Sequence, residues 1–133
     1  MITDLNKDQC KFIYFISFFF LLTSIIKLYQ NKPFIALQTF LIFITSQLYW
    51  RHGNRKSIER KIDVTVVSII IIFNLTYCIY NKCNNLYVII QLIIVCFYPL
   101  GQYFNYINKM WIATYLHSLL HILSNIAVLF FVN

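Results

Sequence analysis

Two histidines stand four residues apart in the segment "YLHSLLHILSN", residues 115–125, within a run that is otherwise largely apolar. Placing an imidazole in hydrocarbon costs free energy unless the ring finds a partner, so His117 and His121 indicate a functional or structural site. Residues four apart on a helix are stacked on one face. The pair therefore has the spacing of two ligands to one metal ion, and Zn²⁺ is commonly held by imidazole nitrogens.

The remaining histidine of the chain is His52, at the end of another apolar run, and Asp63 follows it across a short turn. If the three histidines hold Zn²⁺, the open fourth position carries an activated water, and Asp63 can orient or deprotonate it. Simpler alternatives stay open. His117 and His121 can form hydrogen bonds between helices or relay protons, and His52 can be solvated at the headgroup boundary. Asp63 can be a helix-start carboxylate beside basic neighbours.

These four positions resemble the membrane hydrolase superfamily of alkaline ceramidases and adiponectin receptors, which has a His at the end of span two, an Asp early in span three and His-x-x-x-His in the last span. His52 and Asp63 are eleven residues apart, as in ceramidases, and "HSLLH" matches the final motif. Those proteins hold zinc with three histidines and cleave the amide of a ceramide. The resemblance implies a zinc-dependent hydrolase of a lipid amide or ester, with His52, His117 and His121 as ligands.

A serine one helical turn before the first histidine also belongs to the pattern of that superfamily. Leu48 stands at this position here, and Ser46 lies two residues earlier. The resemblance therefore implies Ser46, beside Asp63, as a catalytic residue. An alignment that starts from Ser46 instead places Trp50 at the ligand position, which leaves two registers for this helix.

The composition is that of an integral membrane protein. Of 133 residues, 60% are hydrophobic and 11% are charged. Apolar runs near the ~20 residues that cross ~30 Å of hydrocarbon recur along the chain. They predict an all-α, multi-pass transmembrane bundle, a single domain over residues 1–133, with spans at about 12–29, 34–52, 58–80, 86–104 and 110–132. Pro33 suits the start of the second span and Ser57 the N-cap of the third, whereas Pro99 and Gly101 are expected to kink the fourth or end it early.

The net charge of +7 comes mainly from lysines and arginines at the predicted helix ends, where they meet lipid headgroups, so nucleic-acid binding is not expected. Eight of these residues fall on one side of the five-span topology and three on the other. The positive-inside rule then places the N-terminus and residues 51–61 in the cytoplasm and the C-terminus on the opposite side. Cys78 and Cys83 flank the end of the third span on that opposite side, where an oxidising lumen would allow a disulfide.

Polar side chains form stripes when the spans are drawn as helices at 100° per residue. On the last span they occupy an arc of about 120° that includes both histidines, opposite Leu116 and Leu120. The other stripes consist of Gln38, Thr45, Tyr49 and His52 on the second span, Asp63 and Asn74 on the third, and Tyr87, Gln91, Tyr98 and Gln102 on the fourth. The sequence thus predicts a bundle with a polar interior.

Two kinds of function fit these features. The first is a reduced zinc-dependent membrane hydrolase acting on a lipid amide or ester. The second is a non-catalytic membrane protein, either a structural or assembly component whose polar stripes join helices, or a small ion or metal conduit. Membrane lipid surrounds the protein in each case.

Overall fold

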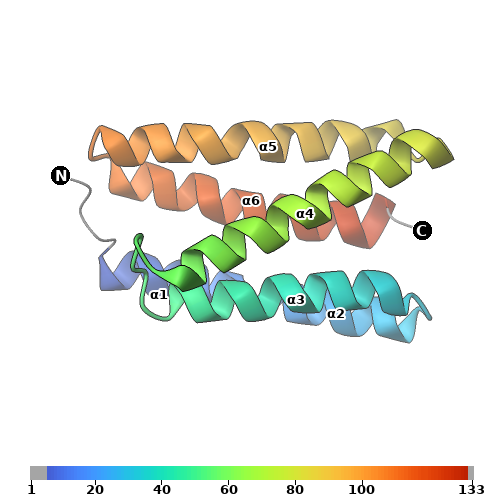
Figure 1. Cartoon of the computed structure of the whole chain (residues 1–133), viewed down its shortest axis with the longest axis horizontal. Coiled ribbons are helices and arrows are strands. Elements are labelled where there is room, and N and C mark those ends of the chain that lie inside the picture. Colours follow the sequence, from blue (N-terminus) through green and yellow to red (C-terminus); the bar gives the residue numbers. More distant parts are fainter. Residues whose placement is uncertain (1–5, 132–133) are drawn as a thin grey trace.

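The computed structural model describes residues 6–131, which form helices joined by short turns and contain no strand (Figure 1). The helices are α1 (Lys7–Ile16), α2 (Phe18–Tyr29), α3 (Pro33–Trp50), α4 (Ile58–Asn81), α5 (Asn85–Tyr106) and α6 (Met110–Phe131). Because α1 and α2 follow one another directly, this part of the chain has five segments long and apolar enough to cross a membrane. The protein is a multi-pass membrane protein, and the prediction of an all-α bundle of about five spans is confirmed.

The ends of α3 and α4 follow local sequence signals. Pro33 begins α3, where its missing backbone donor costs nothing. Ser57 caps α4, because its hydroxyl oxygen accepts a hydrogen bond of 3.3 Å from the amide of Arg60. However, α3 ends at Trp50, two residues before the expected end of the second span. His52 consequently lies in the turn that follows the helix.

Pro99 and Gly101 do not end the fourth span. The helix α5 continues past both residues to Tyr106, so the prediction of an early end is wrong. A proline removes a single backbone donor, and neighbouring helices in a membrane bundle can compensate for the interruption. Gly101 is buried against α6, where an added Cβ would lie 3.9 Å from the carbonyl oxygen of Ala113. This close packing of α5 on α6 supports the helix beyond the proline.

The first span consists of two helices because it is interrupted at Ser17. The buried Ser17 hydroxyl donates to the carbonyl oxygen of Tyr14 at 2.7 Å. From α3, the side-chain amide of Gln47 donates to the same carbonyl oxygen at 3.0 Å and also to the Ser17 hydroxyl. A polar side chain of the neighbouring span therefore satisfies backbone and side-chain acceptors at the interruption.

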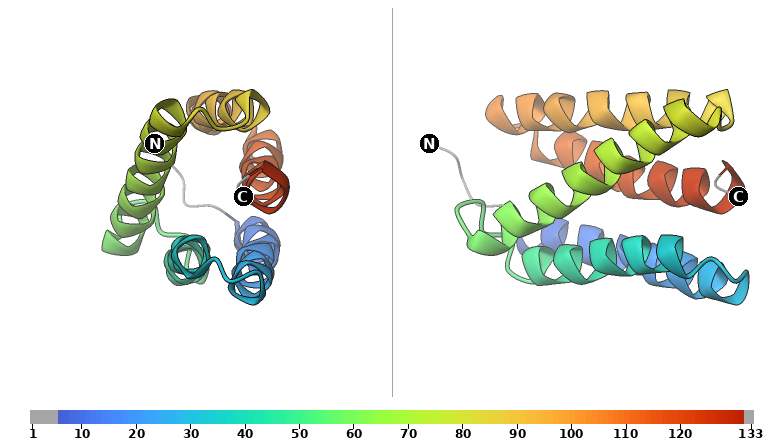
Figure 2. Two further views of the ribbon diagram at one scale, coloured as in Figure 1. Left: turned by 90° about the vertical axis from the view of Figure 1, so that its right-hand side faces the viewer. Right: turned by 45° about the vertical axis from the view of Figure 1, so that its right-hand side comes forward.

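Successive spans run antiparallel, so the turns collect at the two ends of the bundle (Figures 1 and 2). The turns at 51–57 and 107–109 lie at the same end as α1, and those at 30–32 and 82–84 lie at the other. Viewed along the bundle, the spans surround a common interior (Figure 2, left). The axes of most spans are nearly aligned, but the helix α4 is inclined to them. It crosses the bundle obliquely from the end of α3 to the start of α5 (Figure 1).

The interior of the bundle is polar and much of its outer surface is apolar. Phe15, Ile72 and Phe130 are 67%, 64% and 69% exposed, as expected for side chains that contact lipid. The buried polar side chains include Gln38, Thr45, Ser46, Asp63, Gln91, Thr114, Ser118, His121 and Asn125. Apart from His52, which lies in the turn after α3, the predicted polar stripes therefore turn toward protein.

Candidate functional site

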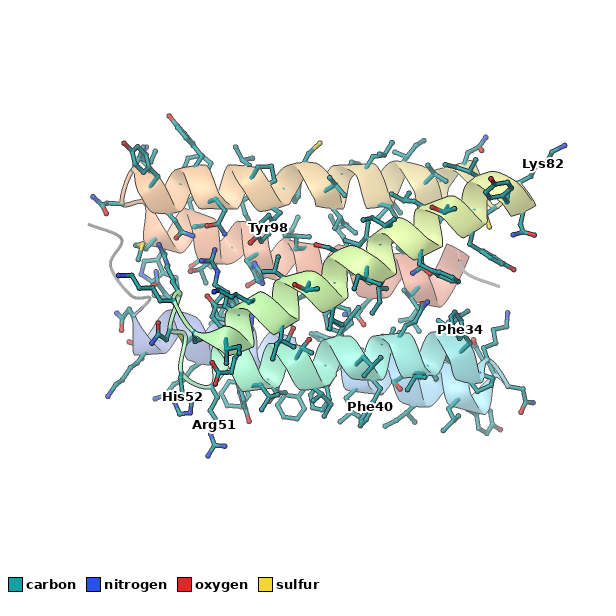
Figure 3. The ribbon with its side chains drawn as sticks, viewed as in Figure 1. Phe34, Phe40, Arg51, His52, Lys82 and Tyr98 are labelled. Carbon is teal, nitrogen blue, oxygen red and sulfur yellow. The ribbon has the colours of Figure 1, made fainter. Side chains whose placement is uncertain are left out.

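A cavity of about 240 Å³ lies inside the bundle, with α3, α4, α5 and α6 contributing most of its walls. Polar side chains from all four helices line it: Gln38, Ser46, Tyr49, Asp63, Asn74, Gln91, Tyr98, Gln102, Asn105, Thr114, His117 and His121. Apolar side chains such as Ile42, Val67 and Ile94 complete the walls. Figure 3 shows Tyr98 of α5 on the inner side of the bundle. The polar stripes of four spans thus meet at one cavity.

His117 and His121 form a pair on α6 at the wall of this cavity. Their Nε2 atoms are 3.1 Å apart, so one ring donates a hydrogen bond and the other accepts it. His121 is only 7% exposed, and its ring packs against Phe20 with the centroids 5.2 Å apart. Among the described residues, Nδ1 of His121 has no hydrogen-bond partner. The surrounding chain therefore satisfies only part of the hydrogen-bonding capacity of the pair.

Leu120 lines the cavity together with the two histidines, although the helical arithmetic placed it opposite the polar stripe. On the helical projection Leu120 is about 40° from Ser124, which lies at the edge of the polar arc. Because the cavity wall is wider than the arc of hydrogen-bonding side chains, it includes this neighbouring leucine. Leu120 therefore lies at the margin of the polar stripe and contributes an apolar side chain to the cavity wall.

The structure does not bring His52 to the histidine pair. It lies in the exposed turn after α3, and its side chain extends away from the bundle (Figure 3). Within residues 6–131, no three His, Cys, Asp or Glu side chains are grouped so that they could hold a metal ion. The ligand set of His52, His117 and His121 is not assembled here because the helix ends before His52. Zinc binding stays a prediction.

Trp50, and not His52, is the residue near the end of α3 whose ring lies beside His117. Its ring centroid is 4.8 Å from that of His117, and the side chain is only 4% exposed. Of the two registers for this helix, the contact matches the one that starts from Ser46. An indole N–H can donate a hydrogen bond but offers no lone pair to a metal. In the described part of the chain, this N–H has no acceptor.

Asp63 is the buried carboxylate of the cavity. Its Oδ1 atom accepts hydrogen bonds from the hydroxyls of Thr45 at 2.7 Å and Ser46 at 3.1 Å. The structure therefore brings together the two predicted catalytic residues, Asp63 and Ser46. No hydrogen bond among the described residues joins Asp63 to either histidine. Thr45 was predicted only as part of a polar stripe, and its contact with Asp63 depends on how α3 and α4 pack.

The charged side chains that line the cavity gather near the turn at 51–57. They are Arg55 in this turn and Arg60 and Asp63 in the first two turns of α4. The guanidinium of Arg60 donates to the carbonyl oxygen of Arg55 at 3.1 Å and to Oε1 of Gln102 at 3.4 Å. From the sequence alone, Arg60 is predicted only as a basic residue at a helix end, where it meets lipid headgroups. Its position three residues before Asp63, on the same helical face, is the signal that places it in the cavity.

The fold and the cavity define a multi-pass membrane protein with a partly polar chamber inside its helical bundle. No family model, curated protein or solved structure matches the chain. Its function is therefore inferred from its own residues and from the chamber that they form.

Proposed function

We propose that the protein binds an amphiphilic molecule, a lipid or lipid-like compound, in the cavity of its membrane-spanning bundle. The observation that carries this proposal is a cavity of about 240 Å³ within the spans, whose walls combine aliphatic side chains with hydrogen-bonding ones. Binding sites for small molecules have this combination, because apolar contacts supply affinity and a few polar groups fix orientation.

Unpartnered polar atoms around the cavity support a role in binding over a purely structural one. Three cavity-lining residues each have a buried polar atom without a partner among the described residues, namely the Trp50 indole nitrogen, Asn105 Oδ1 and His121 Nδ1. A bundle selected only for association would be expected to pair such atoms, since an unmade hydrogen bond in an apolar medium costs about 1–3 kcal/mol. These atoms lie beneath the cavity surface, so a ligand with both donors and acceptors would pair them once the side chains that cover them move.

Filling the cavity tests the proposal. The protein is placed in nanodiscs of zwitterionic lipid, and saturable binding of radiolabelled monoacylglycerol, lysophosphatidylcholine and lysophosphatidate is measured. We expect Leu120→Trp, which fills the cavity wall, to weaken binding at least tenfold. Leu119→Trp is the matched control, because Leu119 is 45% exposed and does not line the cavity. Absence of saturable binding by every compound, or equal loss in both variants, would contradict the proposal.

A zinc-dependent hydrolase of a lipid amide or ester is the second candidate, and the geometry of the histidine pair favours it. On a tetrahedral zinc with bonds of ~2.0–2.1 Å, two nitrogens are about 3.3 Å apart. The Nε2 atoms of His117 and His121 are separated by 3.1 Å, which is close to this distance. One ion could replace their hydrogen bond after the bridging proton is released and both rings turn their lone pairs toward the metal. The Asp63 carboxylate, positioned by Ser46, lies on the same cavity and would orient a reacting water. This candidate also rests on the resemblance to alkaline ceramidases and adiponectin receptors.

Metal analysis of purified protein separates the two candidates. If the hydrolase candidate is right, the wild type contains zinc, and His117→Ala and His121→Ala each lose it. We expect His52→Ala to retain the metal, because that side chain is exposed beyond the end of α3. Loss of zinc in His52→Ala would restore the three-histidine site and would require a rearranged turn. Wild-type protein that contains no zinc and takes up none would eliminate the hydrolase.

A further inference from the structure

We propose that the ligand of the cavity is a phosphate-bearing amphiphile whose phosphate binds at Arg60, near the turn at 51–57. This inference rests on the proposed binding function and adds the chemistry and the orientation of the ligand. It follows from where the charged cavity-lining residues lie: Arg55, Arg60 and Asp63 are all near one end, whereas the other lining side chains are neutral or histidine.

Arg60 is the residue on which the assignment depends. Its guanidinium has five N–H donors, and its hydrogen bonds are to two neutral acceptors, the Arg55 carbonyl oxygen and the Gln102 amide oxygen. A half-buried guanidinium beside hydrocarbon is costly unless a counter-charge or several acceptors compensate it. The planar guanidinium matches the oxygens of a phosphate, which can accept two parallel hydrogen bonds.

Asp63 does not supply the counter-charge to Arg60 in the structure. Its Oδ1 atom is held by the hydroxyls of Thr45 and Ser46, and the described residues show no ion pair between Asp63 and Arg60. Among the described residues, the guanidinium of Arg60 makes hydrogen bonds only to neutral acceptors, so its positive charge at this end of the cavity is not compensated by a carboxylate. An anionic group is therefore the complementary ligand.

Phosphate fits this end better than a carboxylate because it offers more charge and more acceptor oxygens. A phosphate monoester carries a charge of about −1.5 to −2 near neutral pH and has three strongly accepting oxygens. The donors at this end of the cavity would be the guanidinium of Arg60 and the hydroxyl of Tyr49, both of which belong to cavity-lining residues. Several acceptor oxygens on one group can serve donors that come from different helices.

The rest of the cavity accounts for an apolar portion of the ligand. Beyond the charged end, aliphatic side chains from three helices, such as Ile42, Val67 and Ile94, line the walls. A free phosphate would leave these walls without a contact, whereas a hydrocarbon chain would cover them. The ligand class is therefore a phosphate monoester on a hydrocarbon chain.

Competition among headgroups tests the assignment in nanodiscs of phosphatidylcholine. We expect lysophosphatidate to bind at least tenfold more tightly than lysophosphatidylcholine of the same chain length. In Arg60→Gln this preference should disappear. Lys56→Gln is the control, because it removes the same charge from an exposed residue of the adjacent turn and should leave the preference unchanged.

Each other outcome would overturn the inference. Equal affinity of the wild type for the two lysophospholipids would overturn the headgroup assignment while leaving amphiphile binding intact. This measurement uses only the wild-type protein, so it does not depend on whether a variant folds. A preference that survives in Arg60→Gln, or falls equally in Lys56→Gln, would show that Arg60 does not bind the phosphate. If oleate competes as well as lysophosphatidate, the site does not select for phosphate. If inorganic phosphate competes equally well, the hydrocarbon chain does not contribute to binding. If no amphiphile binds, the proposed function itself fails.

Discussion

Asp63 shows how a charged side chain is kept within a membrane-spanning segment. It is 6% exposed, and two hydroxyls of α3 donate to one of its oxygens. Other buried polar residues are satisfied within their own helix: the hydroxyls of Thr114 and Ser118 donate to the backbone carbonyls four residues before them. The contact of Asp63 is different because it joins two spans. It therefore contributes to the association of α3 with α4 as well as to the cavity.

Thr45→Val should weaken this association. Valine matches the shape of threonine but cannot donate to Asp63, and hydrogen bonds to charged groups contribute about 1.5–3 kcal/mol in water-soluble proteins and less between membrane helices. We expect the free energy of unfolding to fall by about 1–2 kcal/mol, measured by titration with sodium dodecyl sulfate in mixed micelles. Thr65→Val, an exposed position on α4, is the control and should change it little. Equal effects at both positions would refute the role of the Thr45 hydroxyl.

At the scale of the elements, the first span is joined to α3 at its interruption. A polar residue one turn from the end of α3, Gln47, donates to acceptors of α1 and of Ser17. A second contact lies farther along the same span, where the Thr23 hydroxyl donates to the side-chain oxygen of Asn125 on α6. The broken first span is thus held to two different helices by polar side chains.

Replacing Gln47 should loosen the first span without disturbing the cavity. Gln47→Leu removes both hydrogen bonds and leaves the Ser17 hydroxyl as the remaining side-chain donor to the Tyr14 carbonyl oxygen. We expect a loss of about 1 kcal/mol in the free energy of unfolding, together with faster hydrogen exchange in residues 14–18. Gln30→Leu, in the exposed turn after α2, is the control. Unchanged exchange in residues 14–18 would show that Gln47 does not support the interruption.

At the scale of the whole molecule, the arrangement of the turns fits the topology that the positive-inside rule predicts. The turn at 51–57 and the turn at 82–84 lie at opposite ends of the bundle (Figure 1). In a cysteine-free background, Ser57→Cys and Asn84→Cys should therefore react with a membrane-impermeant maleimide from opposite sides of sealed vesicles. We expect Ser57→Cys to be labelled from the cytoplasmic side. Labelling of both positions from the same side would be incompatible with the five-span arrangement.

The spans could be predicted from the sequence because length and hydropathy are local properties, and the polar interior because helical periodicity is regular. Which residues belong to the site depends on two features that are not local, namely where α3 ends and how the helices pack together. His52 was included because the second span was extended to residue 52, whereas α3 ends at Trp50. Helix ends cannot be located to within one turn from propensity alone. The sequence offered Trp50 in only one of two registers of this helix, since its contact with His117 depends on how the helices assemble.

The oblique course of α4 determines how a hydrophobic ligand would be supplied. Of the 24 residues of α4, only Asp63 and Cys78 are buried, so the helix is held to the bundle chiefly near its two ends. A molecule that enters the cavity past the middle of α4 comes from the bilayer and not from water. Occupancy would then follow the mole fraction of the ligand in the membrane. Diluting loaded membranes with buffer should leave occupancy unchanged, whereas mixing them with empty vesicles, into which ligand can exchange, should lower it.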